Sequence, residues 1–371
     1  HAWWEYWFGP FIFCKSAASI TNILQNLRCD YSYAHQSLAP KISMTMNIAK
    51  DHVRYYSLAR QALVDALLLG GVKDGDRVLV PEFICKDVVA SIHTVRAIPV
   101  FYQVDELLAP INLQADESIR AIIAVNYFGF PQNLDVFKRE SQHFGAVLIE
   151  DNAHGFLSSD TSNSPLGTRG DLGIISIRKS LRIPDGAQLL VNNQQLLINI
   201  PQQIAYVRSP LGFRFTAQKW ALTVQRITRL PILEWARYVV RKIRLISTGS
   251  ALPISPPSAE FEIITPIGPR DSSMSSIQSL DIAHEINRRK HLYQTVASLV
   301  SKCDVQPVFE SLPANCVPYG YPFYGDSAAA ADVYNLVKKL GIEVINWPDL
   351  PAAVVQTAPI HYRQLWLVNF L

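Results

Sequence analysis

The stretch AVLIEDNAHG, residues 146–155, is the part of the sequence that most clearly indicates the fold. Its four apolar residues, 146–149, are too few for a helix of their own and are typical of a strand buried on both faces. The run ends in Glu150 and Asp151. Open α/β sheets place ligand-binding groups beyond the carboxyl ends of their strands, so this acidic pair marks a candidate site.

A second apolar run, residues 172–177, ends in Arg178 and Lys179. One strand end therefore offers a carboxylate, and another offers an amine. Enzymes that use pyridoxal phosphate (PLP) need this combination, because a lysine binds the cofactor covalently and an acid keeps its pyridine nitrogen protonated. An ordinary turn acid and an exposed lysine would give the same pattern. These residues alone leave both interpretations open.

The order of the predicted elements indicates an α/β fold with a mostly parallel sheet. Short apolar strands alternate with helices between residues 58 and 191, which is typical of a sheet covered on both faces. The helices are expected at 58–69, 86–96 and 133–144. The strands are expected at 77–81, 98–104, 119–125, 146–150, 172–177 and 187–191.

Changes in composition divide the chain into three predicted parts. Residues 1–50 form an N-terminal arm, and residues 51–255 form a large α/β domain with a helical insertion at about 202–250. Residues 256–371 form a small C-terminal α+β domain. In that domain we expect a long helix over 274–301, a helix over 328–340, and strands near 342–346 and 364–370.

The composition argues against several classes of protein. The 371 residues carry a net charge of +3, which gives no reason to expect nucleic-acid binding. Five cysteines without a C-x-x-C pair favour a reduced, cytoplasmic location over disulfides or a zinc site. The aromatic start, residues 1–13, is broken by Glu5, Gly9 and Pro10, so we expect no membrane span. Walker, G-x-G-x-x-G and strand-following G-x-S-x-G motifs are absent from the sequence.

Six blocks in series connect the chain to a known family. Between about residues 55 and 193 the sequence contains LARQALVDALLLGGVKDGDRVLVPEF, IPVFYQVD, AIIAVNYFGFPQNLD, HFGAVLIEDNAHGF, LGTRGDLGIISIRKSL and PDGAQLLV. Together these blocks resemble the DegT/DnrJ-type sugar aminotransferases, PLP enzymes of the aspartate-aminotransferase fold. The resemblance implies that fold, PLP as the cofactor, and a homodimer with its active sites between the subunits.

The resemblance also implies roles for individual residues. Lys179 matches the lysine that forms the Schiff base with PLP, and Asp151 matches the acid that pairs with the pyridine nitrogen. His154 stands where the family usually has a glutamine beside the phenolic oxygen of the ring. Imidazole can donate a hydrogen bond there. Ser176 resembles the serine that contacts the phosphate.

Some positions depart from the family's pattern. Ala59 and Arg60 lie where the family has Gly-Thr at the start of a helix, although backbone N–H groups there can still bind phosphate. Cys85 replaces an aromatic residue that stacks on the cofactor, and its sulfur offers a smaller packing surface. Near Asp271 or Ser272 the family has an asparagine that reaches the neighbouring subunit's phosphate, which an aspartate would repel.

From these residues the sequence predicts a PLP-dependent aminotransferase. An amino acid would donate the amino group, and a keto-sugar, in this family most often joined to a nucleotide, would accept it. A PLP-dependent lyase, dehydratase or epimerase stays open, because the same cofactor serves those reactions. A non-catalytic paralogue of the same fold also stays open as an interpretation. The aromatic N-terminal arm is expected to cover a surface of the partner subunit, and docking on its own domain or on a membrane surface through basic helices at 220–244 stays open.

Overall fold

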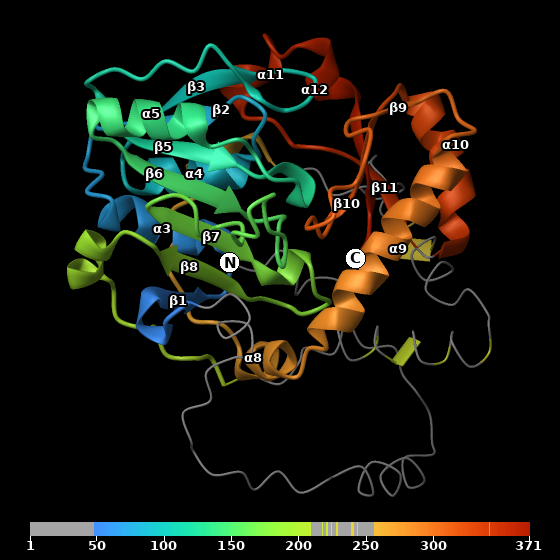
Figure 1. The fold of residues 1–371 in the computed structure, drawn as a ribbon, viewed down its shortest axis with the longest axis horizontal. Coiled ribbons are helices and arrows are strands. Elements are labelled where there is room, and N and C mark those ends of the chain that lie inside the picture. Colours follow the sequence, from blue (N-terminus) through green and yellow to red (C-terminus); the bar gives the residue numbers. More distant parts are fainter. Residues whose placement is uncertain are drawn as a thin grey trace, which may run out of the picture. The chain divides into compact units, whose positions relative to one another are not determined.

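The fold is known from a computed structural model, which describes residues 48–208, 256–340 and 342–371 with single helical positions between 217 and 243. Two sheets organise these residues, one built from residues 53–191 and the other from residues 306–369 (Figure 1). Most of the predicted N-terminal arm and most of the predicted helical insertion lie outside the described residues. Within the described part, no helix is long and apolar enough to cross a membrane.

The larger sheet has eight strands and is mostly parallel, as the sequence predicts. Parallel pairs join β6 to β7, β5 to β6, β2 to β5 and β2 to β3, whereas the pairs at both edges are antiparallel. All five residues of β7 are buried, as expected for a strand covered on both faces. The spatial order is β1 (Val53–Tyr56), β8 (Ala187–Val191), β7 (Leu172–Ser176), β6 (Val147–Asn152), β5 (Ile119–Val125), β2 (Arg77–Pro81), β3 (Ile98–Val104) and β4 (Pro110–Ile111).

Three helices pack on this sheet where the apolar spacing predicts them. They are α3 (Ala59–Leu69), α4 (Lys86–Thr94) and α5 (Asp135–Phe144). Helix α3 contacts β7 and β8, and α5 contacts β5 and β6. Gly145 ends α5 with a φ of 64°, a left-handed conformation that costs glycine little and lets the chain turn into β6.

The smaller sheet is antiparallel and carries the C-terminal helices. Its strand order is β11 (Glu343–Asn346), β12 (Leu365–Asn369), β10 (Gly320–Tyr324) and β9 (Gln306–Pro307). The strands predicted near 342–346 and 364–370 are β11 and β12, and the helix predicted over 328–340 is α10 (Ser327–Val337) with a short 3-10 turn after it. Two short helices, α11 (Ala352–Val355) and α12 (Ile360–Gln364), precede β12.

The prediction of one long helix over 274–301 is wrong, because two helices occupy this range. Helix α8 (Asp271–Gln278) ends before Ser279, and α9 (Ile282–Val300) begins after Asp281. The Asp281 carboxylate accepts a hydrogen bond from the backbone N–H of His284 at 3.0 Å and so caps the first turn of α9. A capping residue has extended backbone, so it cannot continue a preceding helix.

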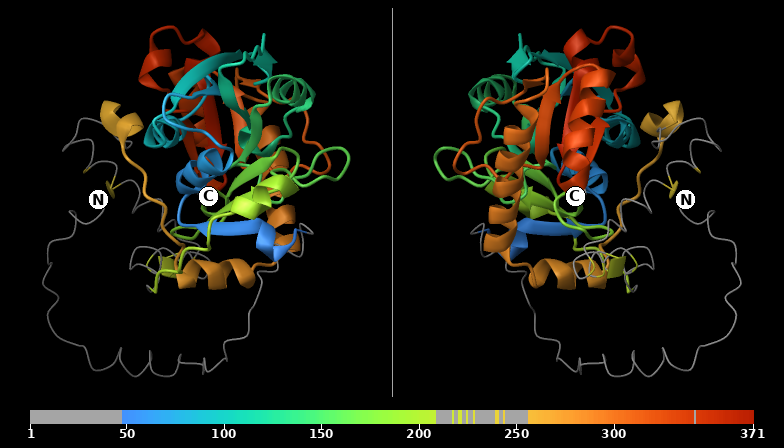
Figure 2. Two further views of the ribbon diagram at one scale, coloured as in Figure 1. Left: turned by 90° about the vertical axis from the view of Figure 1, so that its left-hand side faces the viewer. Right: turned by 90° about the vertical axis from the view of Figure 1, so that its right-hand side faces the viewer.

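Helix α8 packs beside the β1 and β8 edge of the large sheet (Figure 2). Its apolar side chains Met274 and Ile277 are buried in a cluster with Val53 of β1 and Leu190 of β8. The short part of the predicted long helix that precedes Ser279 therefore packs on the large-sheet core. Helix α9 contacts β10 of the small sheet instead.

Buried hydrogen bonds between distant residues join the two sheets. The backbone N–H of Tyr319 donates to the carbonyl of Phe128 at 2.8 Å. The backbone N–H of Val104, at the end of β3, donates to the Tyr362 hydroxyl at 2.8 Å. Because a buried donor without a partner costs free energy, these bonds fix the C-terminal segments against the strand ends of the large sheet.

Gly173 in β7 permits a close approach of two chain segments, which gives a test of the packing. A Cβ atom there would lie 1.8 Å from the backbone oxygen of Gly167. We expect Gly173→Ala to lower the free energy of unfolding by about 3 kcal/mol or more, because backbone must move. Gly145→Ala is the control, since nothing lies within 4 Å of its Cβ and only the left-handed backbone is strained, at about 1 kcal/mol. Urea denaturation of both variants measures the difference, and equal losses would contradict the close approach.

Candidate active site

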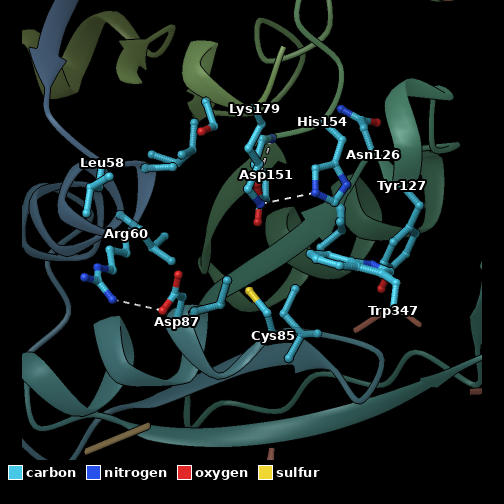
Figure 3. A pocket seen from close by; sticks show the side chains of 18 of the residues that line it. Leu58, Arg60, Cys85, Asp87, Asn126, Tyr127, Asp151, His154, Lys179 and Trp347 are labelled. Atoms are coloured by element: carbon cyan, nitrogen blue, oxygen red, sulfur yellow. Dashed lines mark hydrogen bonds and ion pairs between the residues drawn. The ribbon is translucent and has the colours of Figure 1, made fainter. Parts of the chain in front are cut away.

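One pocket at the strand ends of the large sheet contains seven of the residues to which the sequence resemblance gives a role, whereas Asp271 and Ser272 lie outside its lining (Figure 3). The seven residues come from the carboxyl ends of β6 and β7, from the segment after β2, and from the start of α3. This is the edge at which open α/β sheets bind ligands. The predicted residues in its lining are Ala59, Arg60, Cys85, Asp151, His154, Ser176 and Lys179.

The two acids at the end of β6 have different roles, because neighbouring strand residues face opposite sides. Glu150 is fully buried outside the pocket lining, and its carboxylate pairs with the Arg169 guanidinium at 2.6 Å. It also accepts a hydrogen bond from the Asn126 side chain at 2.8 Å. Glu150 therefore braces the pocket wall, and Asp151 alone of the two lines the pocket.

Asp151 is a buried acid that faces a cation. Its side chain is 6% exposed, and one carboxylate oxygen accepts a hydrogen bond from the backbone N–H of Ala153 at 2.9 Å. Burial raises the pKa of this carboxyl, while the nearby Lys179 charge lowers it. A buried carboxylate is stable only beside positive charge or several donors, so the pocket favours a cationic group next to Asp151.

Lys179 and His154 meet at the centre of the pocket. Lys179 ends the 3-10 turn η3 (Ile177–Lys179) after β7, and its Nζ lies 3.2 Å from Nε2 of His154. Burial and the Lys179 charge hold the pKa of His154 well below its ordinary value. The imidazole is therefore neutral and can accept a hydrogen bond from the ammonium.

Aromatic rings fix the orientation of the His154 imidazole. The ring lies nearly parallel to Tyr319, at 4.6 Å between centroids, and to Phe128, at 5.7 Å. A third ring, Trp347, packs edge-to-face with the imidazole, with 5.0 Å between the ring centroids. These rings exclude water, which is the physical reason for the low pKa of His154.

Cys85 forms part of the pocket wall where the family has an aromatic side chain. Burial raises the pKa of its thiol to about 11, so it stays protonated and packs as a small apolar group. Cys85, Cys303 and Cys316 are free cysteines. Among the described residues, no cluster of histidine, cysteine and acidic side chains could hold a metal ion.

Sequence reasoning missed Trp347, which follows β11 of the small sheet. It lines the pocket, and the Lys179 Nζ lies 5.4 Å from the centroid of its ring. A cation at this distance over an indole face is stabilised electrostatically. No local pattern marks this tryptophan, because it reaches the pocket only through the packing of the two sheets.

Sequence reasoning also missed Arg289 of α9, which holds the chain behind the pocket. Its side chain is 1% exposed, and its Nε donates to Glu285 at 2.7 Å. Its other nitrogens donate to the carbonyls of Tyr319, at 3.2 Å, and of Ser180. Ser180 follows Lys179, and Tyr319 stacks on the imidazole. The Arg289 guanidinium thus holds both the residue that follows Lys179 and the tyrosine that stacks on His154.

The comparison with protein families agrees with this geometry. Residues 44–200 match the DegT/DnrJ/EryC1/StrS aminotransferase family, and every predicted pocket residue falls within this range. This part of the chain is therefore similar to the family. GDP-perosamine synthase of Escherichia coli O157:H7 is 26% identical over 157 residues, which are 40% of this chain and 43% of that protein. The chain spans about half the length of the curated relatives that it matches.

Solved structures share the fold along nearly the whole chain. Spr1654 of Streptococcus pneumoniae, solved in PLP and PMP forms, superposes in its PMP form with a TM-score of 0.59 and 15% identity, covering 96% of this chain and 92% of its own. GDP-4-keto-6-deoxymannose-3-dehydratase (ColD) with bound GDP-perosamine gives a TM-score of 0.54 and 15% identity, covering 89% and 86%. The chain therefore has the α/β fold of the PLP-dependent aminotransferases.

The low pKa of His154 predicts a loss of stability in mild acid. Below its ordinary pKa of about 6.5, the unfolded chain binds a proton at this residue that the folded pocket excludes. The contribution of His154 to the free energy of unfolding is complete above about pH 6.5. It decreases as the pH falls below that value, by up to about 1.4 kcal/mol per pH unit. His154→Gln, which cannot titrate, should lack this loss. Urea denaturation between about pH 7.5 and pH 5.5 compares the two proteins, and parallel curves would contradict a buried neutral imidazole.

Proposed function

We propose that the chain is a PLP-dependent aminotransferase, which moves an amino group from an amino acid to a keto-sugar joined to a nucleotide. The observation that carries the proposal is the meeting of a buried acid, a lysine amine and a neutral imidazole in one pocket. The family match and the GDP-perosamine synthase relative support the choice of reaction and of substrate class.

The residues of the pocket fit the cofactor. The hydroxyl oxygen of Ser176 is buried and has no hydrogen-bond partner among the described residues, as expected for a group that serves a ligand. Lys179 would hold PLP through Nζ, Asp151 would face its ring nitrogen, His154 its phenolic oxygen and Ser176 its phosphate. When bound, PLP supplies an electron-accepting ring that weakens the bonds at the α-carbon of the amino acid.

The chain's own residues move and hold protons. In its neutral form, the Lys179 amine takes the proton from the α-carbon of the amino donor, and later gives a proton to the former ketone carbon of the sugar. Asp151 stays ionised beside a positive ring nitrogen, because the opposite charge offsets the cost of its burial. Phe128, Tyr319 and Trp347 exclude water from the amine and the imidazole.

A sugar dehydratase is the second candidate, because one of the similar structures is the dehydratase ColD. The products distinguish the two reactions. An aminotransferase converts the amino donor to a keto acid in equal amount with the amino sugar, whereas a dehydratase removes water from the sugar. The homodimer and the cytoplasmic location stay predictions from the sequence.

Lys179→Ala tests the position of the amine. We expect this variant to lose both covalent PLP trapping by borohydride and amino transfer, while it stays folded, because the turn after β7 keeps its backbone contacts. Lys86→Ala is the matched control, since Lys86 lies at the start of α4 and pairs with Asp349 at 3.4 Å, outside the pocket lining. Trapping that survives in Lys179→Ala and fails in Lys86→Ala would move the role to Lys86.

Asp151→Asn tests the charge of the buried acid. The amide keeps the size of the side chain but cannot stabilise a positive ring nitrogen, at a cost of about 2–5 kcal/mol. We expect turnover to fall by about two to four powers of ten while borohydride still traps PLP at Lys179. Asp135→Asn, an exposed change on α5, serves as the control. Turnover of Asp151→Asn within a few-fold of the parent protein would exclude this role.

A further inference from the structure

A second cationic side chain lies beside Lys179, and the proposed reaction leaves it without a task. Arg178 precedes Lys179 in η3 and lines the same pocket. Its Nε is buried and has no hydrogen-bond partner within the described part of the chain, where it also forms no ion pair. A guanidinium keeps its charge in proteins, so a buried donor of this kind costs free energy until a ligand supplies the acceptor.

Ser176 lies two residues before Arg178 and presents a second unpaired donor. Its side chain is 0% exposed, it lines the pocket, and its hydroxyl has no partner among the described residues. One strand end thus offers an N–H group and an O–H group that both lack an acceptor. A phosphate monoester suits this pair, because it carries nearly two negative charges and three acceptor oxygens.

The other pocket cations already have partners. Arg60 forms ion pairs with Asp87 at 3.0 Å and with Glu262 at 3.7 Å, so two carboxylates surround its guanidinium. These carboxylates would repel a phosphate that approached the Arg60 side chain. The Lys179 amine contacts His154. Arg178 is therefore the guanidinium in the lining that forms neither an ion pair nor, at its Nε, a hydrogen bond with the described residues.

We propose that Arg178 joins Ser176 at the phosphate of PLP and supplies the positive charge that neutralises it, an inference that rests on the proposed function. The backbone at the start of α3, at Ala59 and Arg60, lines the same pocket and adds the positive end of an 11-residue helix. Arg178 supplies the full positive charge that this backbone cannot. The side chain of Arg60 stays paired with Asp87 and Glu262.

Binding of PLP and of pyridoxal, which lacks the phosphate, tests this role of Arg178 without any measurement of turnover. The full chain is titrated with each compound, reduced with borohydride, and the label at Lys179 is quantified. We expect Arg178→Gln to weaken PLP binding by about 10- to 100-fold and to leave pyridoxal binding unchanged, because only PLP loses charged hydrogen bonds. Ser176→Ala should reduce the preference for PLP by a smaller factor. Arg139→Gln, an exposed change on α5, is the matched control.

A second measurement needs no variant. Inorganic phosphate should weaken the binding of PLP to the parent protein and leave pyridoxal binding unchanged, compared with sodium chloride of the same ionic strength. This role of Arg178 is wrong if Arg178→Gln keeps the preference for PLP, or if Arg60→Gln loses it instead. It is also wrong if Arg178→Gln raises only the KM of the amino donor, since the guanidinium would then bind the donor's carboxylate. Failure of the parent protein to bind either compound would overturn the proposed function itself.

Discussion

The contact between the Lys179 amine and the His154 imidazole, 3.2 Å long and beside the buried Asp151, is the interaction on which the rest of the site depends. The groups come from the ends of two neighbouring parallel strands, β6 and β7, where Asp151 pairs in register with Ile174. Aromatic rings keep the imidazole neutral, and Arg289 ties down the chain next to both. The large sheet thus places the reactive groups, and the C-terminal segments hold them.

The charges of the pocket are complementary to a molecule with a positive ring and a negative tail. Among the described residues, the Asp151 carboxylate accepts a hydrogen bond from the backbone of Ala153, whereas the Arg178 Nε–H and the Ser176 hydroxyl have no acceptor. Each would be costly in a dry protein interior without a ligand. A protonated pyridine ring that carries a phosphate would satisfy both kinds of group. The buried acid and the unpaired donors are therefore a physical argument for PLP that does not depend on the family match.

The large sheet and the seven predicted pocket residues were predictable, because each residue stands at a strand end or a helix start of an alternating α/β pattern. Topology brings such positions to one edge. Trp347, Tyr319 and Arg289 were not predictable, since they reach the pocket through hydrogen bonds and packing between residues far apart in the sequence. The error at 274–301 has a local cause. An unbroken apolar stripe hid the capping aspartate, Asp281, that separates two helices.

The most direct test of the central claim is the covalent position of the cofactor. The parent protein is incubated with PLP, reduced with borohydride and digested, and the peptides are mapped by mass spectrometry. The structure predicts a single pyridoxyl group on the peptide that contains Lys179, with the modification on that lysine. A pyridoxyl group on another lysine, or no modified peptide at saturating PLP, would contradict the account.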